Sequence, residues 1–191
     1  MAKTIDILTV IDPLGLPDNL QHLRNPPLST PIQDIPMLSI ADLRKYVWMI
    51  GENDSVVENQ ASWNLHIKAS QLDQIRWWDV TVVQDTMTDV IIIDFAVSSN
   101  WSSVLDQPTA HVKLDAIAYI ENGFQLGNIS NLEFTMATLR NNYITAQVKE
   151  NAQLGTIVNY TLTVAKLDIR GVQAPPVKAL YRFDPTITIV R

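Results

Sequence analysis

Apolar and polar side chains alternate with a period of two through most of this chain. Residues 63–70, WNLHIKAS, put apolar side chains at every second position. Successive side chains of an extended strand point to opposite faces, so the pattern predicts a strand with one buried and one solvated face. Residues 111–120, HVKLDAIAYI, and 156–168, TIVNYTLTVAKLD, repeat it. In the first of these we expect Val112 and Leu114 inside, with His111, Lys113 and Asp115 outside.

Further strands are indicated at the opening TIDILTVID and at KYVWMI, DVIIIDFAV, LEFTMATL, NYITAQVKE and TITIV. Short strands spaced about 8–12 residues apart are typical of two packed sheets, and no long segment with a 3.6-residue period supplies crossover helices. We therefore predict an all-β chain: an antiparallel β-sandwich with a two-sheet, jelly-roll or Ig-like architecture. DVIIIDFAV is apolar on both faces before Asp94, which predicts a place in the middle of a sheet. Pro185 predicts that the last strand begins after it.

Residues 13–43 differ in composition from the rest of residues 1–191, which we expect to form a single domain. Six of the ten prolines lie in this segment. A long proline-rich connection is unusual inside a compact domain and is often functional. We predict either a loop that covers an open sheet edge or an arm that reaches a neighbouring subunit. Ser39 is a candidate N-cap for a single helical turn in SIADLRKY.

Composition excludes several classes of function. The chain has 14 basic and 20 acidic residues and a net charge of -6, without a basic cluster, which argues against nucleic acid or an anionic membrane as partner. It has no cysteine, which excludes disulfides, Cys-ligated zinc and thiol catalysis. Its apolar runs fall far short of the ~20 residues that span a bilayer. The start, MAKTIDILTVID, predicts no signal peptide, so we expect a cytoplasmic protein.

The sequence contains no recognisable catalytic or metal-binding motif. The three histidines lack partners at metal-ligand spacing, and the six glycines form no phosphate-binding or nucleophile motif. Glu52, Asn53 and Asp54, and separately Asp106, supply oxygen atoms of the kind that calcium prefers, but without an EF-hand spacing. We expect a non-enzymatic protein with no metal site and no cofactor.

The loop at residues 98–108, SSNWSSVLDQP, carries Trp101 among small polar residues. A loop tryptophan can stack on a sugar ring, with Asn100 and Asp106 as polar neighbours, or it can close one end of the sandwich. The first alternative predicts a carbohydrate-binding module, with calcium as a further ligand. A third possibility is a small apolar ligand between the sheets, which needs a cavity of ~300 Å³ or more.

Residues 74–86, QIRWWDVTVVQDT, place two tryptophans side by side. Strict alternation from Ile75 through Trp77 would put Asp79 in the core, which is costly for an unpaired charge. A β-bulge near Trp78 and Asp79 would avoid that cost. We therefore predict that Trp77 is buried, and that Trp78 and Asp79 turn toward an edge or a partner chain.

Several blocks of the sequence, in order, carry a family resemblance. MAKTIDILTVID, YVWMI, NLHIKAS, DQIRWWDVT, NYITAQVKEN, VNYTLTVAKLDIRG and ALYRFDP resemble the bacterial PixA/AidA inclusion-body protein family over the whole chain. The resemblance implies a β-sandwich without catalytic activity, quorum-sensing control, and either intracellular inclusions or interaction with a host. It makes Trp77 and Asp184 motif positions, which we interpret as structural. Our first hypothesis is a self-associating, homo-oligomeric inclusion-body protein, and our alternative is lectin-like binding of glycans.

Overall fold

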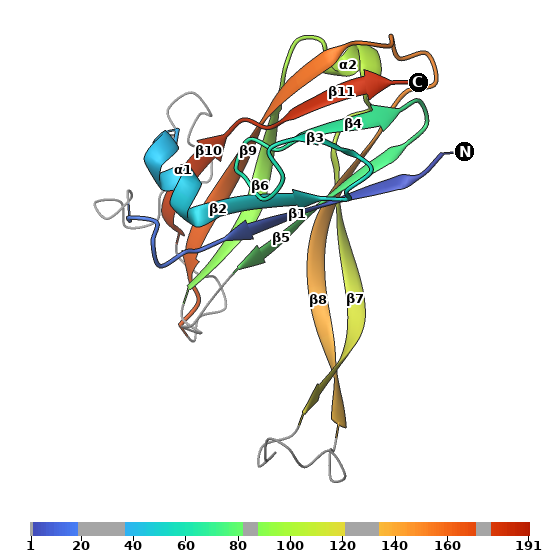
Figure 1. Cartoon of the computed structure of the whole chain (residues 1–191). Helices are drawn as coiled ribbons and strands as arrows, with labels where there is room; N and C mark the ends of the chain where they lie inside the picture. The colour runs from blue at the N-terminus through green and yellow to red at the C-terminus, as the bar shows by residue number, and fades with distance from the viewer. Residues whose placement is uncertain (1, 19–36, 82–87, 121–133, 171–176) are drawn as a thin grey trace.

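Two β-sheets face each other in this protein and enclose one main hydrophobic core (Figure 1). A computed structural model describes residues 2–18, 37–81, 88–120, 134–170 and 177–191. The predicted all-β sandwich is confirmed. These residues contain two short helices: α1 (Ile40–Tyr46) precedes the second strand, and α2 (Trp101–Val104) lies at one end of the sheets.

The first sheet has five strands in the order β2-β1-β5-β8-β7. Their bounds are β1 Thr4–Ile11, β2 Val47–Gly51, β5 Gln74–Thr81, β7 Thr109–Ile120 and β8 Phe134–Gln147.

The second sheet runs in the order β10-β9-β11-β4-β3, with β6 paired to the other side of β9. Its strands are β3 Val56–Glu58, β4 His66–Ser70, β6 Thr88–Val97, β9 Ile157–Asp168, β10 Val177–Phe183 and β11 Thr186–Val190. As predicted, the last strand begins directly after Pro185.

Both sheets are mixed, although most of their ladders are antiparallel as predicted. β1 pairs in parallel with β5, and β11 pairs in parallel with β4. Between β4 and β5 the chain passes from one sheet to the other, and buried Asp73 holds this corner. Its carboxylate accepts hydrogen bonds from the backbone N–H groups of Lys3 (2.9 Å) and Ser70 (2.8 Å). Buried backbone donors need such partners, so Asp73 stabilises the crossover.

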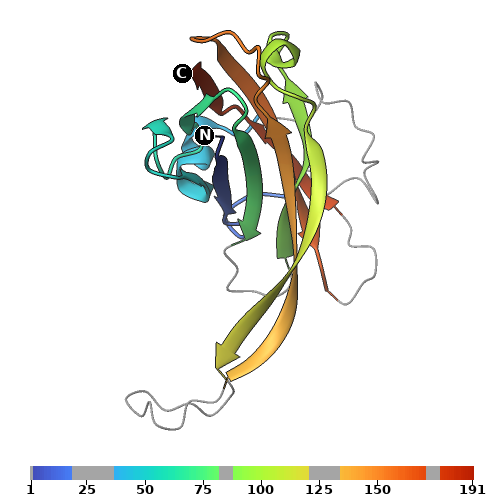
Figure 2. The same cartoon turned by 90° about the vertical axis from the view of Figure 1, so that its right-hand side faces the viewer.

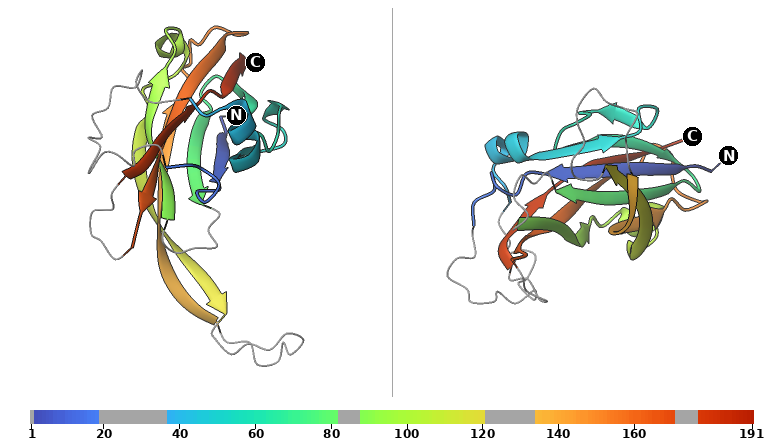
Figure 3. Two further views of the ribbon diagram at one scale, coloured as in Figure 1. Left: turned by 90° about the vertical axis from the view of Figure 1, so that its left-hand side faces the viewer. Right: turned by 90° about the horizontal axis from the view of Figure 1, so that it is seen from below.

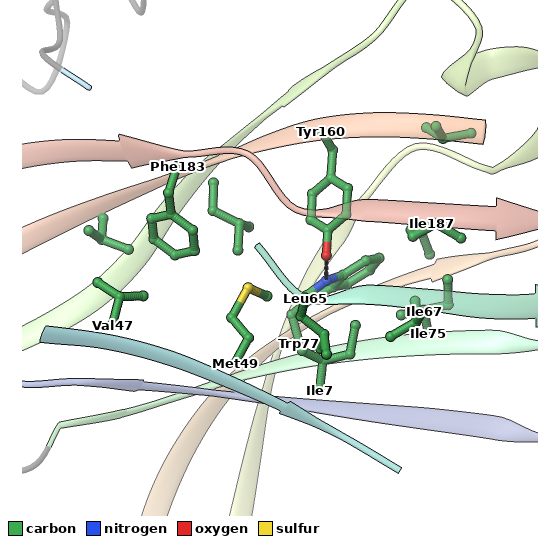
Figure 4. Close-up of a cluster of buried hydrophobic side chains, with 14 of the residues drawn as sticks. Ile7, Val47, Met49, Leu65, Ile67, Ile75, Trp77, Tyr160, Phe183 and Ile187 are labelled. Atoms are coloured by element: carbon green, nitrogen blue, oxygen red, sulfur yellow. Dashed lines mark hydrogen bonds between the residues drawn. The ribbon is translucent and has the colours of Figure 1, made fainter. Parts of the chain in front are cut away.

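Trp77 lies at the centre of the core and joins the two sheets (Figure 4). From β5 its indole Nε1–H donates a hydrogen bond of 2.8 Å to the hydroxyl of Tyr160 on β9. The ring also meets Phe95 and Tyr160 edge to face, at centroid distances of 5.0 and 5.6 Å. Edge-to-face contacts of this kind contribute beyond the buried area alone.

The apolar strand β6 departs from its predicted place in the middle of a sheet. Among the described residues it pairs with β9 alone, and the register shifts between Ile92 and Asp94. This bulge turns Asp94 to the exposed side and returns Phe95 to the core. Both faces of β6 are apolar because Ile91 and Ile93 pack in a second, smaller cluster.

The described ends of the proline-rich segment 13–43 pack on their own chain. The Tyr181 hydroxyl donates to the carbonyl of Pro17, and Lys166 donates to the carbonyl of Leu16 at 2.6 Å. Ser39 caps α1 as predicted, because its side chain accepts a hydrogen bond from the N–H of Asp42. Residues 19–36 lie outside the described part of the chain, so the arm to a neighbouring subunit stays a prediction.

The β7–β8 hairpin extends well beyond the sandwich (Figure 2). β5 pairs only with the C-terminal part of β8, from Tyr143 to Gln147, whereas β7 follows β8 as far as Phe134. Within the described part of the chain, the outer half of the hairpin therefore has no third strand beside it and no opposite sheet against it, as the left view of Figure 3 also shows.

We expect Tyr160→Phe to destabilise the protein, because it removes the acceptor of the buried Trp77 N–H. A buried donor without a partner costs about 1–3 kcal/mol. Urea denaturation should show this loss in the free energy of unfolding. Tyr143→Phe, on the outer face of the first sheet, is the matched control and should change it by less than about 0.5 kcal/mol. Equal effects in the two variants would contradict the bridging role of the bond.

Candidate interaction surface

The two neighbouring tryptophans point to opposite faces of an unbroken strand. β5 stays in register with β1 from Thr4 opposite Gln74 to Ile11 opposite Thr81, without a shift. The predicted bulge at Trp78 and Asp79 is therefore wrong. Trp77 is completely buried as predicted, Trp78 lies half-buried on the outer face, and Asp79 shares the inner face with Trp77.

Asp79 accordingly does not belong to the surface that carries Trp78. It lies opposite Thr9, whose buried hydroxyl has no hydrogen-bond partner among the described residues. Burial first, and then repulsion from Asp89, raise the pKa of Asp79 to about 7. The strand therefore tolerates this carboxyl on its inner face by holding its proton more tightly, instead of turning it outward.

A row of stacked rings crosses the outer face of the first sheet. Trp78 on β5 stacks on Tyr143 of β8 with centroids 4.5 Å apart, and Tyr143 stacks on His111 of β7 at 5.0 Å. Lys113 and Arg76 lie over the Trp78 ring, 5.9 and 5.5 Å from its centroid. We call these five residues, together with Asp6, the Trp78 surface. It leads from the middle of the sheet to its β7 edge.

Asp6 orders the Trp78 surface from the neighbouring strand β1. Its carboxylate accepts two hydrogen bonds from the Arg76 guanidinium (2.7 and 2.6 Å) and one from the Trp78 Nε1–H (2.7 Å). Partial burial opposes ionisation, but these hydrogen bonds and the charges of Arg76 and Lys113 outweigh it and lower the pKa of Asp6. Asp6 thus fixes the positions of one cationic and one aromatic side chain, Arg76 and Trp78, on this face.

The opposite face of the β7–β8 hairpin exposes several apolar side chains, most of them from β7, and we call it the apolar face. The side chains of Val112, Leu114 and Met136 are 56%, 65% and 62% exposed. Paired residues of an antiparallel ladder point to the same side, so the register of β7 and β8 puts these three on one face. It puts the exposed polar residues Asn142 and Thr138 of β8 on that face too, opposite Val112 and Ala116. Val112 and Leu114 were predicted to be inside. Their alternation is as predicted, but the hairpin carries them past the end of the opposite sheet.

The residues proposed for a glycan site form the end of the core. Trp101 is completely buried, and its indole N–H donates to the carbonyl of Asp106 at 2.8 Å. Asn100 donates through its side chain to the carbonyl of Ile157 at 2.7 Å, and Asp106 is exposed. The hypothesis that Trp101 stacks on a sugar is wrong, because its ring has no exposed face; the loop closes the sandwich, as the other alternative predicted.

A cavity of about 270 Å³ opens between the edges of the two sheets. Asp94 and Gln107 place polar groups in it beside Phe95 and Ile144, so it is not the purely apolar space that a hydrophobic ligand would favour. Within the described ranges, no three His, Cys, Asp or Glu side chains lie close enough together to hold a metal ion. Nor does the described part of the chain contain a helix long and apolar enough to cross a membrane.

By fold, the protein belongs to the all-β class of two-sheet sandwiches with mixed sheets. A family model described as "PixA: Inclusion body protein" matches residues 3–189, and the chain therefore belongs to the PixA inclusion body protein family. A crystal structure of an inclusion body protein (PixA) from Burkholderia cenocepacia J2315 has the same fold: the TM-score is 0.61 at 12% sequence identity, over 100% of this chain and 97% of that one. No curated protein matches.

We expect Asp79→Asn to stabilise the protein at high pH. The folded-state pKa, about 7, lies above the ordinary value of 3.8, so the stability that Asp79 contributes falls as pH rises from about 4 to 7. Above pH 7 the variant should exceed the parent by about 2–4 kcal/mol in free energy of unfolding, and at pH 4 the difference should vanish. Urea titrations at pH 4, 6 and 8 measure this.

Asp54→Asn is the control for this prediction. Hydrogen bonding to Lys3, and its charge, lower the pKa of Asp54, so its removal should give no gain at pH 8. Parallel stability profiles of Asp79→Asn and the parent from pH 4 to 8 would show that Asp79 titrates normally.

Proposed function

We propose that this PixA-family chain is a non-enzymatic protein that functions by self-association into inclusions in the cytoplasm. The observation that carries the proposal is the exposed apolar face of the β7–β8 hairpin, defined by Val112, Leu114 and Met136. The family description as an inclusion body protein supports it. Quorum-sensing control and interaction with a host, which the family resemblance implies, stay predictions.

The apolar face continues the core face of the first sheet. Ile144 of β8 packs against the core, and its register partner Ala110 lies on the same side of β7. Farther out along the same two strands, the opposite sheet ends and the side chains meet water. Each large apolar side chain that a partner covers there contributes on the order of 1 kcal/mol or more. A second copy of the chain would replace the missing layer.

The Trp78 surface lies on the other side of the same strands and favours the same conclusion. Its rings and cations form a fixed, partly exposed array at the sheet edge, and aromatic side chains and arginine are enriched at protein interfaces. Trp78 therefore remains our interface candidate, whereas Asp79, on the inner face, does not.

Light scattering coupled to size-exclusion chromatography tests the proposal. Across about 1 µM to 1 mM, we expect the average mass to rise above the 21.5 kDa of one chain. Leu114→Ser should shift this rise to higher concentration. Leu154→Ser is the matched control, because Leu154 is 43% exposed but lies outside the hairpin. A mass of one chain at every concentration would refute self-association.

A further inference from the structure

β7 is the last strand of the first sheet. Within the described part of the chain its ladder runs to β8 alone, so its other edge presents unpaired backbone N–H and C=O groups. It is also long, with 12 residues from Thr109 to Ile120. Long exposed edges are templates for pairing with another chain, and most proteins shorten, cover or interrupt them. This edge borders both the Trp78 surface and the exposed apolar face.

The side chains at the middle of β7 are complementary to themselves. Lys113 and Asp115 flank Leu114 and lie on the outer face, whereas Val112, Leu114 and Ala116 lie on the apolar face. Suppose two copies of β7 run antiparallel about a two-fold axis at Leu114. Lys113 of each copy then lies opposite Asp115 of the other, Val112 opposite Ala116, and Leu114 opposite Leu114. Oppositely charged residues in directly opposed positions stabilise such a pair.

Neighbouring registers lack this complementarity. Opposed residues of an antiparallel pair point to the same side of the sheet. The outer face of one copy therefore continues into the outer face of the other only when the two-fold axis lies at a residue, which then opposes its own copy. Moving the axis to residue 113 places Lys113 opposite Lys113, and moving it to residue 115 places Asp115 opposite Asp115. Like charges in directly opposed positions are destabilising.

We propose that two copies of this chain join edge to edge through β7, antiparallel and centred on Leu114, so that their first sheets form one continuous sheet. The inference rests on the proposed self-association and names its contact. In the single chain Lys113 Nζ already lies 2.7 Å from Asp115 Oδ1 and over the Trp78 ring. Pairing turns these two charges into a group of four at the centre of an isologous interface.

The apolar side of the joined hairpins gains most from this contact. Leu114, 65% exposed in one chain, comes to lie beside its own copy, with Val112 and Ala116 on either side. The two hairpins then present one apolar strip instead of two separate ones. Such a strip gives further copies a larger surface to bind, which links a symmetric pair to the growth of an inclusion.

Single-cysteine variants test the register directly, because the chain has no cysteine of its own. Directly opposed Cβ atoms lie about 4.5–5.5 Å apart, a separation from which a disulfide can form with little movement. Under mild oxidation Leu114→Cys should give a covalent dimer. Val112→Cys and Ala116→Cys should not when each is alone, because copies of one residue would then lie about 13 Å apart. A mixture of these two variants should give the mixed dimer.

Charge variants test the same contact without a covalent bond. Lys113→Asp places two acidic pairs across the axis and should raise the dimer dissociation constant at least roughly fivefold. The double variant Lys113→Asp, Asp115→Lys exchanges the two charges and should restore the affinity of the parent. Because this exchange also restores the ion pair within each chain, a mixture of the two single variants Lys113→Asp and Asp115→Lys decides between the roles. Neither chain of the mixed dimer has its own Lys113–Asp115 pair, but acidic and basic residues lie opposite each other across the axis, so the mixed dimer should form; a merely local role of the pair would not predict it.

The outcomes separate this inference from the proposed function. If the mass rises with concentration, but Leu114→Cys cross-links no better than Val112→Cys, the chain self-associates through another surface and the β7 pairing is refuted. Pairing of β7 with the β2 edge of the next copy would give that result. If every variant stays monomeric, both proposals fail. Circular dichroism and the urea midpoint of each variant, reduced, exclude misfolding as the cause; Leu114 is exposed, so both should match the parent.

Discussion

The contact between Trp77 and Tyr160 sets the arrangement of the whole sandwich. It is the buried hydrogen bond that links a central strand of the first sheet to β9 of the second, and the rings of Phe95 and Trp101 pack around it. Once Trp77 points inward, the geometry of an extended strand turns Trp78 outward. The paired tryptophans thus mark one core position and one surface position of the same strand, and the Trp78 surface exists because the core requires Trp77.

In two strands of this protein, regular alternation would place an aspartate on the inner face, and the two strands accommodate it differently. In β5 the inward series Ile75 and Trp77 leads to Asp79, and in β6 the series Val90 and Ile92 leads to Asp94. β6 pairs antiparallel with β9, and β-bulges occur mostly in antiparallel pairs. The ladder of β5 with β8 ends at Trp78, but β5 stays paired in parallel with β1 as far as Thr81, and a bulge at Asp79 would break this parallel ladder. Its register is kept, and the carboxyl of Asp79 takes a raised pKa instead. Sequence alone does not reveal whether a strand pairs in parallel or antiparallel, which is why the bulge was predicted in the wrong strand.

Alternation predicted most strands, the two-sheet fold and the buried side of β5, and the resemblance predicted the family. Alternation did not predict the parallel pairs β1–β5 and β11–β4, because a period of two indicates which side a residue faces and not which strand lies beside it. The stacking of Trp78, Tyr143 and His111 depends on that neighbour order, so no local pattern contained it. The burial of Trp101 was one of two alternatives, because a loop tryptophan looks the same in sequence whether or not the core extends beneath it.

The β7–β8 hairpin shows that alternation does not predict which strands are covered by a second sheet. In sequence, Val112 and Leu114 resemble core residues as closely as Val158 and Leu162 do, yet the first two are exposed and the last two completely buried. They differ because a facing sheet covers Val158 and Leu162, whereas the sheet opposite β7 ends before Val112 and Leu114, and no residue of β7 indicates where that sheet ends. An alternating strand without its covering layer still carries the features of a buried one: an apolar face, ordered charges on the other face and a full set of backbone pairing groups at its edge. The pairing that we propose would satisfy these features, and the symmetric order of Lys113, Leu114 and Asp115 suits a second β7 better than an unrelated strand.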